Sequence, residues 1–298
     1  DAQSRSPNVL LLPGVELTTY GGHANGIGAT EWVDHRVGLG GVTADGIAAA
    51  LVAQGAVFSI NHPVIDVGTL CIGCKWEHSL PRASLGAVEI GTGGWDESGL
   101  LFTRQAIAFW DRALDLGLHV AAVGGSDDHE GGAGSGSPIG NPTTLVWASE
   151  LTVAGIVAGV REGRTVVKLQ GPSDPMVEVT AGDARLGDTV AASEATFRAV
   201  VTGGLGAQLR WVVDGEPQAP VDVGADPFEA QLTLAAPESG KTRVRAEVML
   251  GGYPRTVTSH LWLTAPPPRT PGCAAAPGPV ALLLALAKLG RRRRTSQM

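Results

Sequence analysis

The stretch HVAAVGGSDDHEGG, residues 119–132, decides how the first half of this chain is interpreted. A short apolar run ends in two glycines, and Asp127, Asp128 and His129 follow at once. A solvated turn is one interpretation of such a group. The other is a metal site at the end of a buried strand, because carboxylates and imidazoles are both common metal ligands. The rest of the sequence has to distinguish these two hypotheses.

The composition is that of a folded protein with a sizeable core. Of the 298 residues, 44% are hydrophobic and 17% are charged, and the length suggests about two domains. The net charge of −7 argues against a nucleic-acid-binding protein that acts through a basic face. The one dense basic run, Arg291–Arg294, lies close to the C-terminus.

Up to about residue 170, predicted helices alternate with short apolar strands. Thr43 is a candidate N-cap for a helix that runs to about residue 54. Further helices are predicted over 103–116 and 152–162, and strands over 56–60, 87–91, 119–123, 143–147 and 165–169. This alternation predicts an α/β fold with a parallel sheet or barrel covered by helices. In such folds the functional residues gather at the carboxyl ends of the strands.

From residue 174 the pattern changes to short alternating segments separated by Gly, Pro, Asp and Ser. Six such segments predict a small antiparallel β-sandwich that resembles an immunoglobulin domain. The sequence therefore divides into a first domain over 1–173, a sandwich over 174–264, and a Pro-rich linker with a C-terminal tail over 265–298.

Four segments of the first domain place metal-ligand residue types beside apolar strands. Glu16 and His23 come from the first apolar segment, His62 follows the strand over 56–60, and Glu89 lies in the next strand. The group at Asp127–His129 completes the set. Each motif alone is weak, but the ordered set predicts that these side chains meet at one rim of the fold.

The motifs GVEL…GH, NHP, VEI and GGSDDH, followed by GNPTT…REGRT, resemble the PHP (polymerase and histidinol phosphatase) metallohydrolase domain. The likeness is to its carbaryl-hydrolase-like branch, CehA/McbA, and it covers about residues 8–170. It implies a distorted (β/α)7 barrel with one to three divalent ions (Zn, Mn or Fe) at its rim. It also implies hydrolysis of a phosphoester, or of a carboxylic or carbamic ester, by metal-activated water. The expected partner is thus a small-molecule or ester substrate.

The resemblance assigns roles to individual residues. Glu16 matches a bridging ligand, His23 and His62 match its companions on one metal, Asp127 matches a ligand of a second, and His129 a ligand of a third. Beyond these metal ligands it indicates no further catalytic group. Two carboxylates are candidates for supporting the ligands: Glu89, with orientation of a loop or a salt bridge as its alternatives, and Asp128, with a solvated position as its alternative.

The sequence departs from the family in two motifs. The opening His-x-His and the Thr-Asp-His turn of PHP domains are both missing. We therefore expect an N-terminally truncated barrel with weak or no activity. The alternative hypothesis is a non-catalytic cell-surface binding protein with a degenerate PHP scaffold.

The cysteines and the tail bear on localisation. Cys71 and Cys74 form CIGC, which predicts a local disulfide in an exported protein, with a redox pair as the alternative. The segment PGCAAAPGPVALLLALAKLGRRRR resembles MYXO-CTERM sorting signals. It implies processing and lipid attachment at Cys273, and hence anchoring at the cell surface or outer membrane. A basic tail without a sorting function is the alternative.

Overall fold

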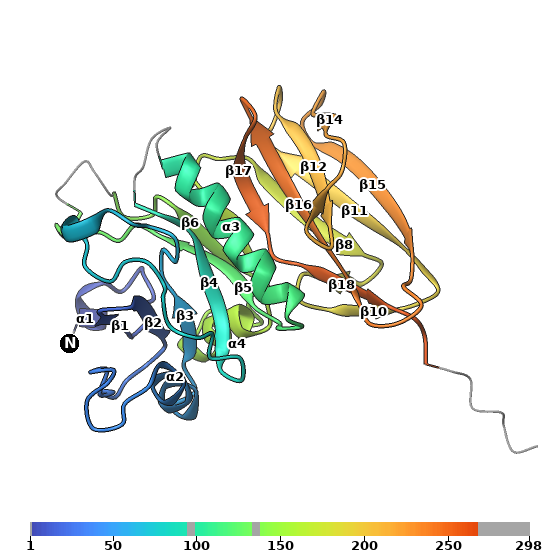
Figure 1. Ribbon diagram of the computed structural model, residues 1–298. Helices are drawn as coiled ribbons and strands as arrows, with labels where there is room; N and C mark the ends of the chain where they lie inside the picture. Colours follow the sequence, from blue (N-terminus) through green and yellow to red (C-terminus); the bar gives the residue numbers. More distant parts are fainter. Residues whose placement is uncertain (1, 94–98, 133–137, 268–298) are drawn as a thin grey trace, which may run out of the picture. The chain divides into compact units, whose positions relative to one another are not determined.

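The computed structural model of the protein describes residues 2–93, 99–132 and 138–267, which contain four α-helices and 18 strands in three sheets (Figure 1). Asp1–Pro266 form one compact unit. The sorting signal predicted for the tail, with Cys273, lies outside the described residues. In the part of the chain that is described, no helix combines the length and apolarity that a membrane crossing requires.

The first sheet has the strand order β1-β2-β3-β4-β5. Strand β2 is antiparallel to both of its neighbours, β1 and β3, whereas β3, β4 and β5 run parallel to one another. Their bounds are β1 (Gly14–Thr19), β2 (Gly22–Ile27), β3 (Val57–Ile60), β4 (Leu85–Thr92) and β5 (Ala121–Gly125). The carboxyl ends of the three parallel strands therefore lie at one edge, together with the start of β2.

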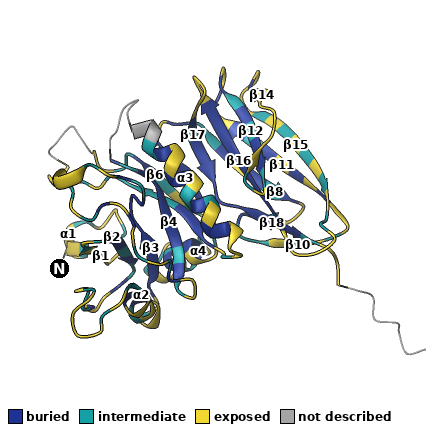
Figure 2. Cartoon of the chain, in the orientation of Figure 1, coloured by how far each residue is buried: buried dark blue, intermediate teal, exposed yellow. Residues whose placement is uncertain are grey.

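Helices cover both faces of this sheet, which explains why its parallel strands are continuously apolar. Phe58 and Val88 belong to the core cluster that includes Trp110 of α3 (Gly99–Asp115). Val57 and Ala87, the residues just before them in the same strands, pack instead with Val157 of α4 (Val153–Arg161). Buried and exposed residues accordingly alternate along α3 (Figure 2).

The three predicted helices are confirmed, and so is the N-cap predicted at Thr43. The side chain of Thr43 accepts an N–H bond from Gly46 at the start of α2 (Ala44–Ala53), and Thr152 caps α4 in the same way. The two remaining helical segments are α1 (Ala2–Arg5) and the short 3₁₀ helix η1 (Gly68–Leu70).

The prediction of a (β/α)7 barrel is wrong. The first strand segment folds into the β1–β2 hairpin, with Thr19 opposite Gly22 and only two residues in the turn. Strands β6 (Thr143–Val146) and β7 (Thr165–Lys168) pair antiparallel with each other, and β7 continues onto β17 (Tyr253–Thr258) instead of extending the parallel sheet. Apolar periodicity locates a strand but does not encode the direction in which it pairs, so the sequence pattern did not predict the mixed sheet.

Two further sheets enclose the second core. The four-stranded sheet has the order β15-β11-β8-β9, and its core-facing residues, such as Phe197 and Val179, pack against Leu209 and Val248 of the nine-stranded sheet. The strands not yet named are β8 (Met176–Ala181), β9 (Ala184–Arg185), β10 (Thr189–Ala191), β11 (Glu194–Thr202), β12 (Gln208–Val213), β13 (Glu216–Pro217), β14 (Val221–Asp222), β15 (Phe228–Ala235), β16 (Thr242–Leu250) and β18 (Leu261–Thr264).

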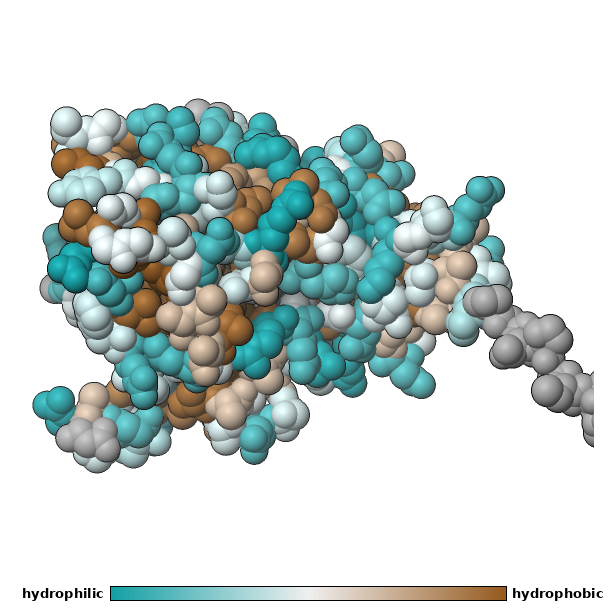
Figure 3. Space-filling view, turned by 60° about the horizontal axis from the view of Figure 1, so that its bottom comes forward, coloured by the Kyte–Doolittle hydropathy of each residue, from teal (hydrophilic) through white to brown (hydrophobic). Residues whose placement is uncertain are grey.

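Arginines of β16 join the nine-stranded sheet to α3. Arg245 forms two hydrogen bonds, of 2.6 and 3.0 Å, to the Asp111 carboxylate, and Arg243 contacts Asp115 at 2.6 Å. Because Arg245 is buried, these carboxylates, with Glu247 at 2.9 Å, compensate the loss of its hydration. The surface itself is mixed, since apolar side chains form several separate groups between polar ones on the face drawn in Figure 3.

Hydroxyl groups close the free edge of β5. The N–H of Ala122 donates to Ser259 Oγ at 3.0 Å, and its carbonyl accepts from Thr165 Oγ1 at 2.7 Å. Gly124 exchanges both of its backbone hydrogen bonds with Thr144 Oγ1, at 2.8 and 2.7 Å. Side chains thus take the place of a sixth strand and satisfy buried backbone groups that would otherwise be costly.

Removing one of these hydroxyls should destabilise the whole unit. We expect Ser259→Ala to lower the free energy of unfolding by roughly 1–3 kcal/mol, because it leaves the buried Ala122 N–H without an acceptor. Urea denaturation followed by circular dichroism measures the change. The exposed Ser79→Ala is the matched control and should stay within about 0.5 kcal/mol of the wild type. Equal stability of the two variants would contradict this role for Ser259.

Candidate metal centre

The β1–β2 hairpin brings Glu16 and His23 together. In its register, Glu16 lies opposite Asn25 and His23 lies opposite Thr18, so Glu16 and His23 are diagonal neighbours across the pair. The Glu16 Oε1 atom is 3.5 Å from His23 Nδ1. Two ligand types that are seven positions apart in sequence are thus placed side by side by a two-residue turn.

His62 reaches the same carboxylate from the end of β3. The Asn61 N–H donates to the His23 carbonyl at 3.1 Å, which fixes the chain at the point where β3 ends. His62 Nε2 then lies 3.9 Å from Glu16 Oε1, and the two imidazole rings are 5.0 Å apart between centroids. The Asn61 side chain donates to Glu16 Oε1 at 3.0 Å and orients it.

The loop that contains the cysteines holds the other nitrogen of each ring. His23 Nε2 lies 3.3 Å from the Ile72 carbonyl, and His62 Nδ1 lies 3.1 Å from the Cys74 carbonyl. A carbonyl oxygen only accepts hydrogen bonds, so each of these nitrogens carries the proton. His23 Nδ1 and His62 Nε2 are therefore the nitrogens that face Glu16.

The neighbouring charges shift the pKa values of these groups. The hydrogen-bonding contact with His23 lowers the pKa of Glu16 and raises that of His23. Burial lowers the pKa of His62, which favours its neutral form. In that form the lone pair of Nε2 faces a carboxylate oxygen, an arrangement that becomes favourable when a cation lies between them.

Asp127 belongs to the same electrostatic cluster. Burial raises its pKa, His62 lowers it and Glu16 raises it. Asp127 and His62 have φ angles of 51° and 26°, in a region that non-glycine residues rarely adopt. Of the three such residues in the described chain, two therefore lie in this cluster, and backbone strain of this kind concentrates at functional sites.

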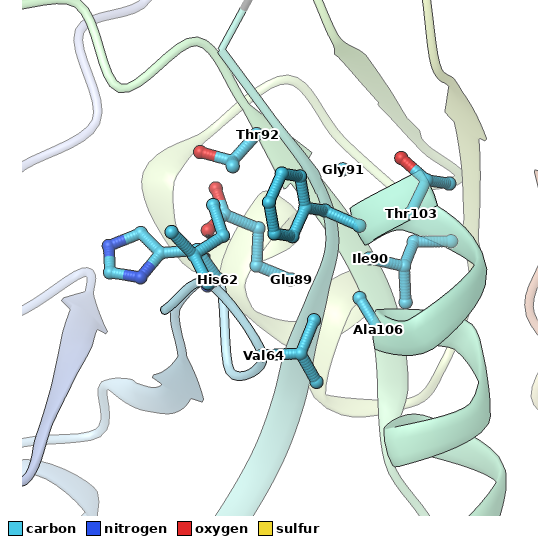
Figure 4. A pocket seen from close by; sticks show the side chains of 10 residues that line it. His62, Val64, Glu89, Ile90, Gly91, Thr92, Thr103 and Ala106 are labelled. Carbon is cyan, nitrogen blue, oxygen red and sulfur yellow. Dashed lines mark hydrogen bonds between the residues drawn. The ribbon is translucent and has the colours of Figure 1, made fainter. Parts of the chain in front are cut away.

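Glu89 holds the backbone of the candidate metal centre at His62. Its carboxylate accepts the His62 N–H at 2.7 Å and also the backbone N–H of Gly125, and so links the ends of β3 and β5. Figure 4 shows this carboxylate beside Thr92, with the His62 ring turned away from it. Burial raises the pKa of Glu89 to about 8. The adjoining cavity of about 10 Å³ has room for about one water molecule, so a substrate would have to bind elsewhere.

The structure does not bring His129 and Asp128 to the other ligands. The His129 ring is 77% exposed and turns back to the Asp127 carbonyl at 2.7 Å. Asp128 accepts N–H bonds from Glu130 and Gly132, at 3.1 and 2.6 Å, and so stabilises its own loop.

Two contributors to the centre were missed in the sequence. Asn61 stands next to His62 in the NHP motif, and its position one residue beyond a strand is the signal that could have revealed it. Cys74 lies close to both histidines, although the structure pairs it with Cys71 in a disulfide.

The donor set fits a divalent metal ion. One nitrogen of each imidazole lies within 4 Å of the same Glu16 oxygen, at 3.5 and 3.9 Å, with Asp127 nearby, and this combination of ligand types suits Zn, Mn or Fe. In the described part of the chain, no lysine or arginine forms an ion pair with Glu16, Glu89 or Asp127. A cation would therefore relieve the repulsion between Glu16 and Asp127, and that with Glu89 wherever this residue is ionised.

Comparisons with known proteins leave the family open. No protein-family model and no curated protein matches the chain. Two structures of the CARDB domain of the PF1109 protein from Pyrococcus furiosus, one in complex with di-metal ions, are 16% and 19% identical. Each covers 30% of this chain and 94% of its own, with a TM-score of 0.21. An engineered protein is 14% identical over 74% of this chain and 44% of its own, with a TM-score of 0.23. TM-scores this low do not establish a shared fold.

The pKa of Glu89 predicts a specific dependence of stability on pH. Its pKa in the folded protein, about 8, lies above the ordinary value of 4.5, so the folded state holds the proton more tightly than the unfolded state. Its contribution to stability is thus present at low pH and is lost as the pH rises through about 8. Relative to the wild type, Glu89→Gln should gain on the order of 3 kcal/mol of stability between about pH 5 and pH 8.

Urea denaturation at several pH values in the presence of a chelator measures this change. Glu194→Gln, which replaces an exposed carboxylate on β11, is the control and should follow the wild type at every pH. A Glu89→Gln curve parallel to that of the wild type would contradict the raised pKa.

Proposed function

We propose that the protein is a metal-dependent hydrolase whose centre is formed by Glu16, His23 and His62. One observation carries the proposal: each imidazole donates one N–H to a loop carbonyl and turns its other nitrogen toward a single carboxylate oxygen. Histidines that bind metals are held in this way by backbone carbonyls, which fix the tautomer and the ring orientation.

The ligand count supports a catalytic rather than a structural ion. Three protein ligands with an open position are the usual arrangement of catalytic zinc, whereas structural zinc sites are closed by four. A bound divalent ion supplies Lewis-acid chemistry and lowers the pKa of water toward 7.

The residues of this chain prepare that chemistry. Asn61 keeps Glu16 Oε1 pointed at both rings, and Glu89 holds the backbone at His62. Asp127 is half-buried at the same edge, where its carboxylate can bind a second ion. The His129 ring is 77% exposed and faces the Asp127 carbonyl, so it could bind a third ion only after a change of rotamer.

The substrate class follows from the resemblance to PHP domains of the carbaryl-hydrolase-like branch. A small phosphoester, or a carboxylic or carbamic ester, presents the electrophilic centre that activated water attacks. The cell-surface location implied by the tail belongs to the same proposal.

Loss of a ligand should lower metal binding. We expect Glu16→Gln and His62→Ala each to weaken Zn²⁺ or Mn²⁺ affinity at least about tenfold, because removing a ligand costs more than removing a group that supports one. Competition with a chromophoric chelator gives the affinities. His35→Ala, a half-buried histidine outside the centre, is the matched control. Affinities equal to the wild type in all three variants would refute the site.

Hydrolysis is tested separately, on the metal-loaded protein with p-nitrophenyl phosphates and p-nitrophenyl esters. We expect slow, metal-dependent release of p-nitrophenol that His62→Ala abolishes and His35→Ala retains. Metal binding without hydrolysis of any of these substrates would favour the alternative, a non-catalytic binding protein.

A further inference from the structure

The loop that orients both histidines also carries a disulfide, and this combination points to a second state of the metal centre. Cys74 is 6% exposed, and its Sγ and one nitrogen each of His23 and His62 all lie within 4.8 Å of one another. In the disulfide this sulfur is bonded to Cys71 and is not a thiolate ligand. Reduction would turn it into one without any large movement of the chain.

The other half of the disulfide is open to attack. Cys71 is half-buried, and the cavity beside it, of about 310 Å³, is lined by Tyr20, Asp66 and Lys75. Cys74 also lines this cavity but is 6% exposed, so a thiol can approach Cys71 Sγ more readily.

The loop keeps its place for reasons other than the disulfide. The Trp76 N–H donates to the Pro63 carbonyl at 3.0 Å, and the Glu77 N–H donates to the Gly21 carbonyl at 2.7 Å. Gly73, with a φ of 79°, lies so close to β1 that an added Cβ would be 2.0 Å from the Thr19 carbonyl oxygen. These contacts should hold the Cys74 sulfur near the rings after the S–S bond is cleaved.

We propose that reduction of the Cys71–Cys74 disulfide converts the centre into a thiolate-containing metal site formed by His23, His62 and Cys74. The proposal deepens the proposed function, because it describes a redox regulation of the same two histidines. Thiolate ligands favour softer ions, so the reduced state should select Zn²⁺ or Co²⁺ over Mn²⁺.

The reductant is a dithiol, which cleaves the protein disulfide in two thiol–disulfide exchange steps. One thiolate of the dithiol attacks Cys71 Sγ, the S–S bond breaks, and Cys74 leaves as a thiolate. The second thiol of the reductant then attacks the mixed disulfide, which releases Cys71 and oxidises the dithiol to its own disulfide. Two electrons pass to the protein, and the two protons of the dithiol go to Cys71 and, in the absence of a metal ion, to Cys74.

Cobalt reports the new ligand directly, because a Co²⁺–thiolate bond gives a charge-transfer absorption band that imidazole and carboxylate ligands lack. The experiment uses the full chain with Cys273→Ser, which removes the remaining cysteine, and adds Co²⁺ before and after reduction by dithiothreitol and its removal. We expect no band in the oxidised protein and a band in the reduced protein.

Two single variants separate the thiolate from the loss of the disulfide. In the same background, Cys71→Ser leaves Cys74 as a free thiol and should show the band without reductant. Cys74→Ser also lacks the disulfide but should show no band in either state. Absence of the band from both the reduced protein and Cys71→Ser would overturn the proposal, as would a band of equal strength in Cys74→Ser.

Failure of the redox proposal can be distinguished from failure of the proposed hydrolase function. If the oxidised protein binds Mn²⁺ or Zn²⁺ but Co²⁺ never gives the band, only the redox proposal fails. If the oxidised protein binds no metal while Cys71→Ser gives the band, the Glu16 centre fails and the thiolate site stands.

Discussion

The hydrogen bonds between three hydroxyl groups and the free edge of β5 are the constraint on which the rest of the structure depends. Thr144, Thr165 and Ser259 satisfy the backbone of Ala122 and Gly124, which no sixth strand pairs. They attach the first sheet to β6, to β7 and to the segment between β17 and β18. They also fix the end of β5, and with it the turn that carries Asp127 into the metal centre.

The candidate centre shows how a short turn and a short loop create a donor set. The β1–β2 hairpin supplies Glu16 and His23, β3 delivers His62, and the Cys71–Cys74 loop determines which ring nitrogens are free to bind. Burial and mutual repulsion raise the pKa of the surrounding carboxylates Glu89 and Asp127. Binding of a cation and reduction of the Cys71–Cys74 disulfide would therefore each change the net charge of the candidate metal centre.

The sequence predicted the elements of the fold better than their arrangement. Helix α2 begins at the threonine cap predicted for it, and α4 begins close to the predicted residue. Five of the six segments predicted after residue 174 correspond to β8, β11, β12, β15 and β16, whereas the sixth is divided between β17 and β18. The barrel was wrong because strand direction depends on partners that are remote in sequence. For the site, residue type and position after a strand led to His62 and Asp127, but neither signal could indicate that His129 lies exposed.

By itself, the sequence determined the local features: caps, strand positions, and which residues have metal-binding chemistry, since these depend on neighbours along the chain. Only the tertiary structure decided the mixed pairing of the first sheet and the convergence of Glu16 with both imidazoles. It alone also placed Cys74 against them. Those features depend on distances between segments far apart in the chain, and such distances are set by the packing of the whole unit.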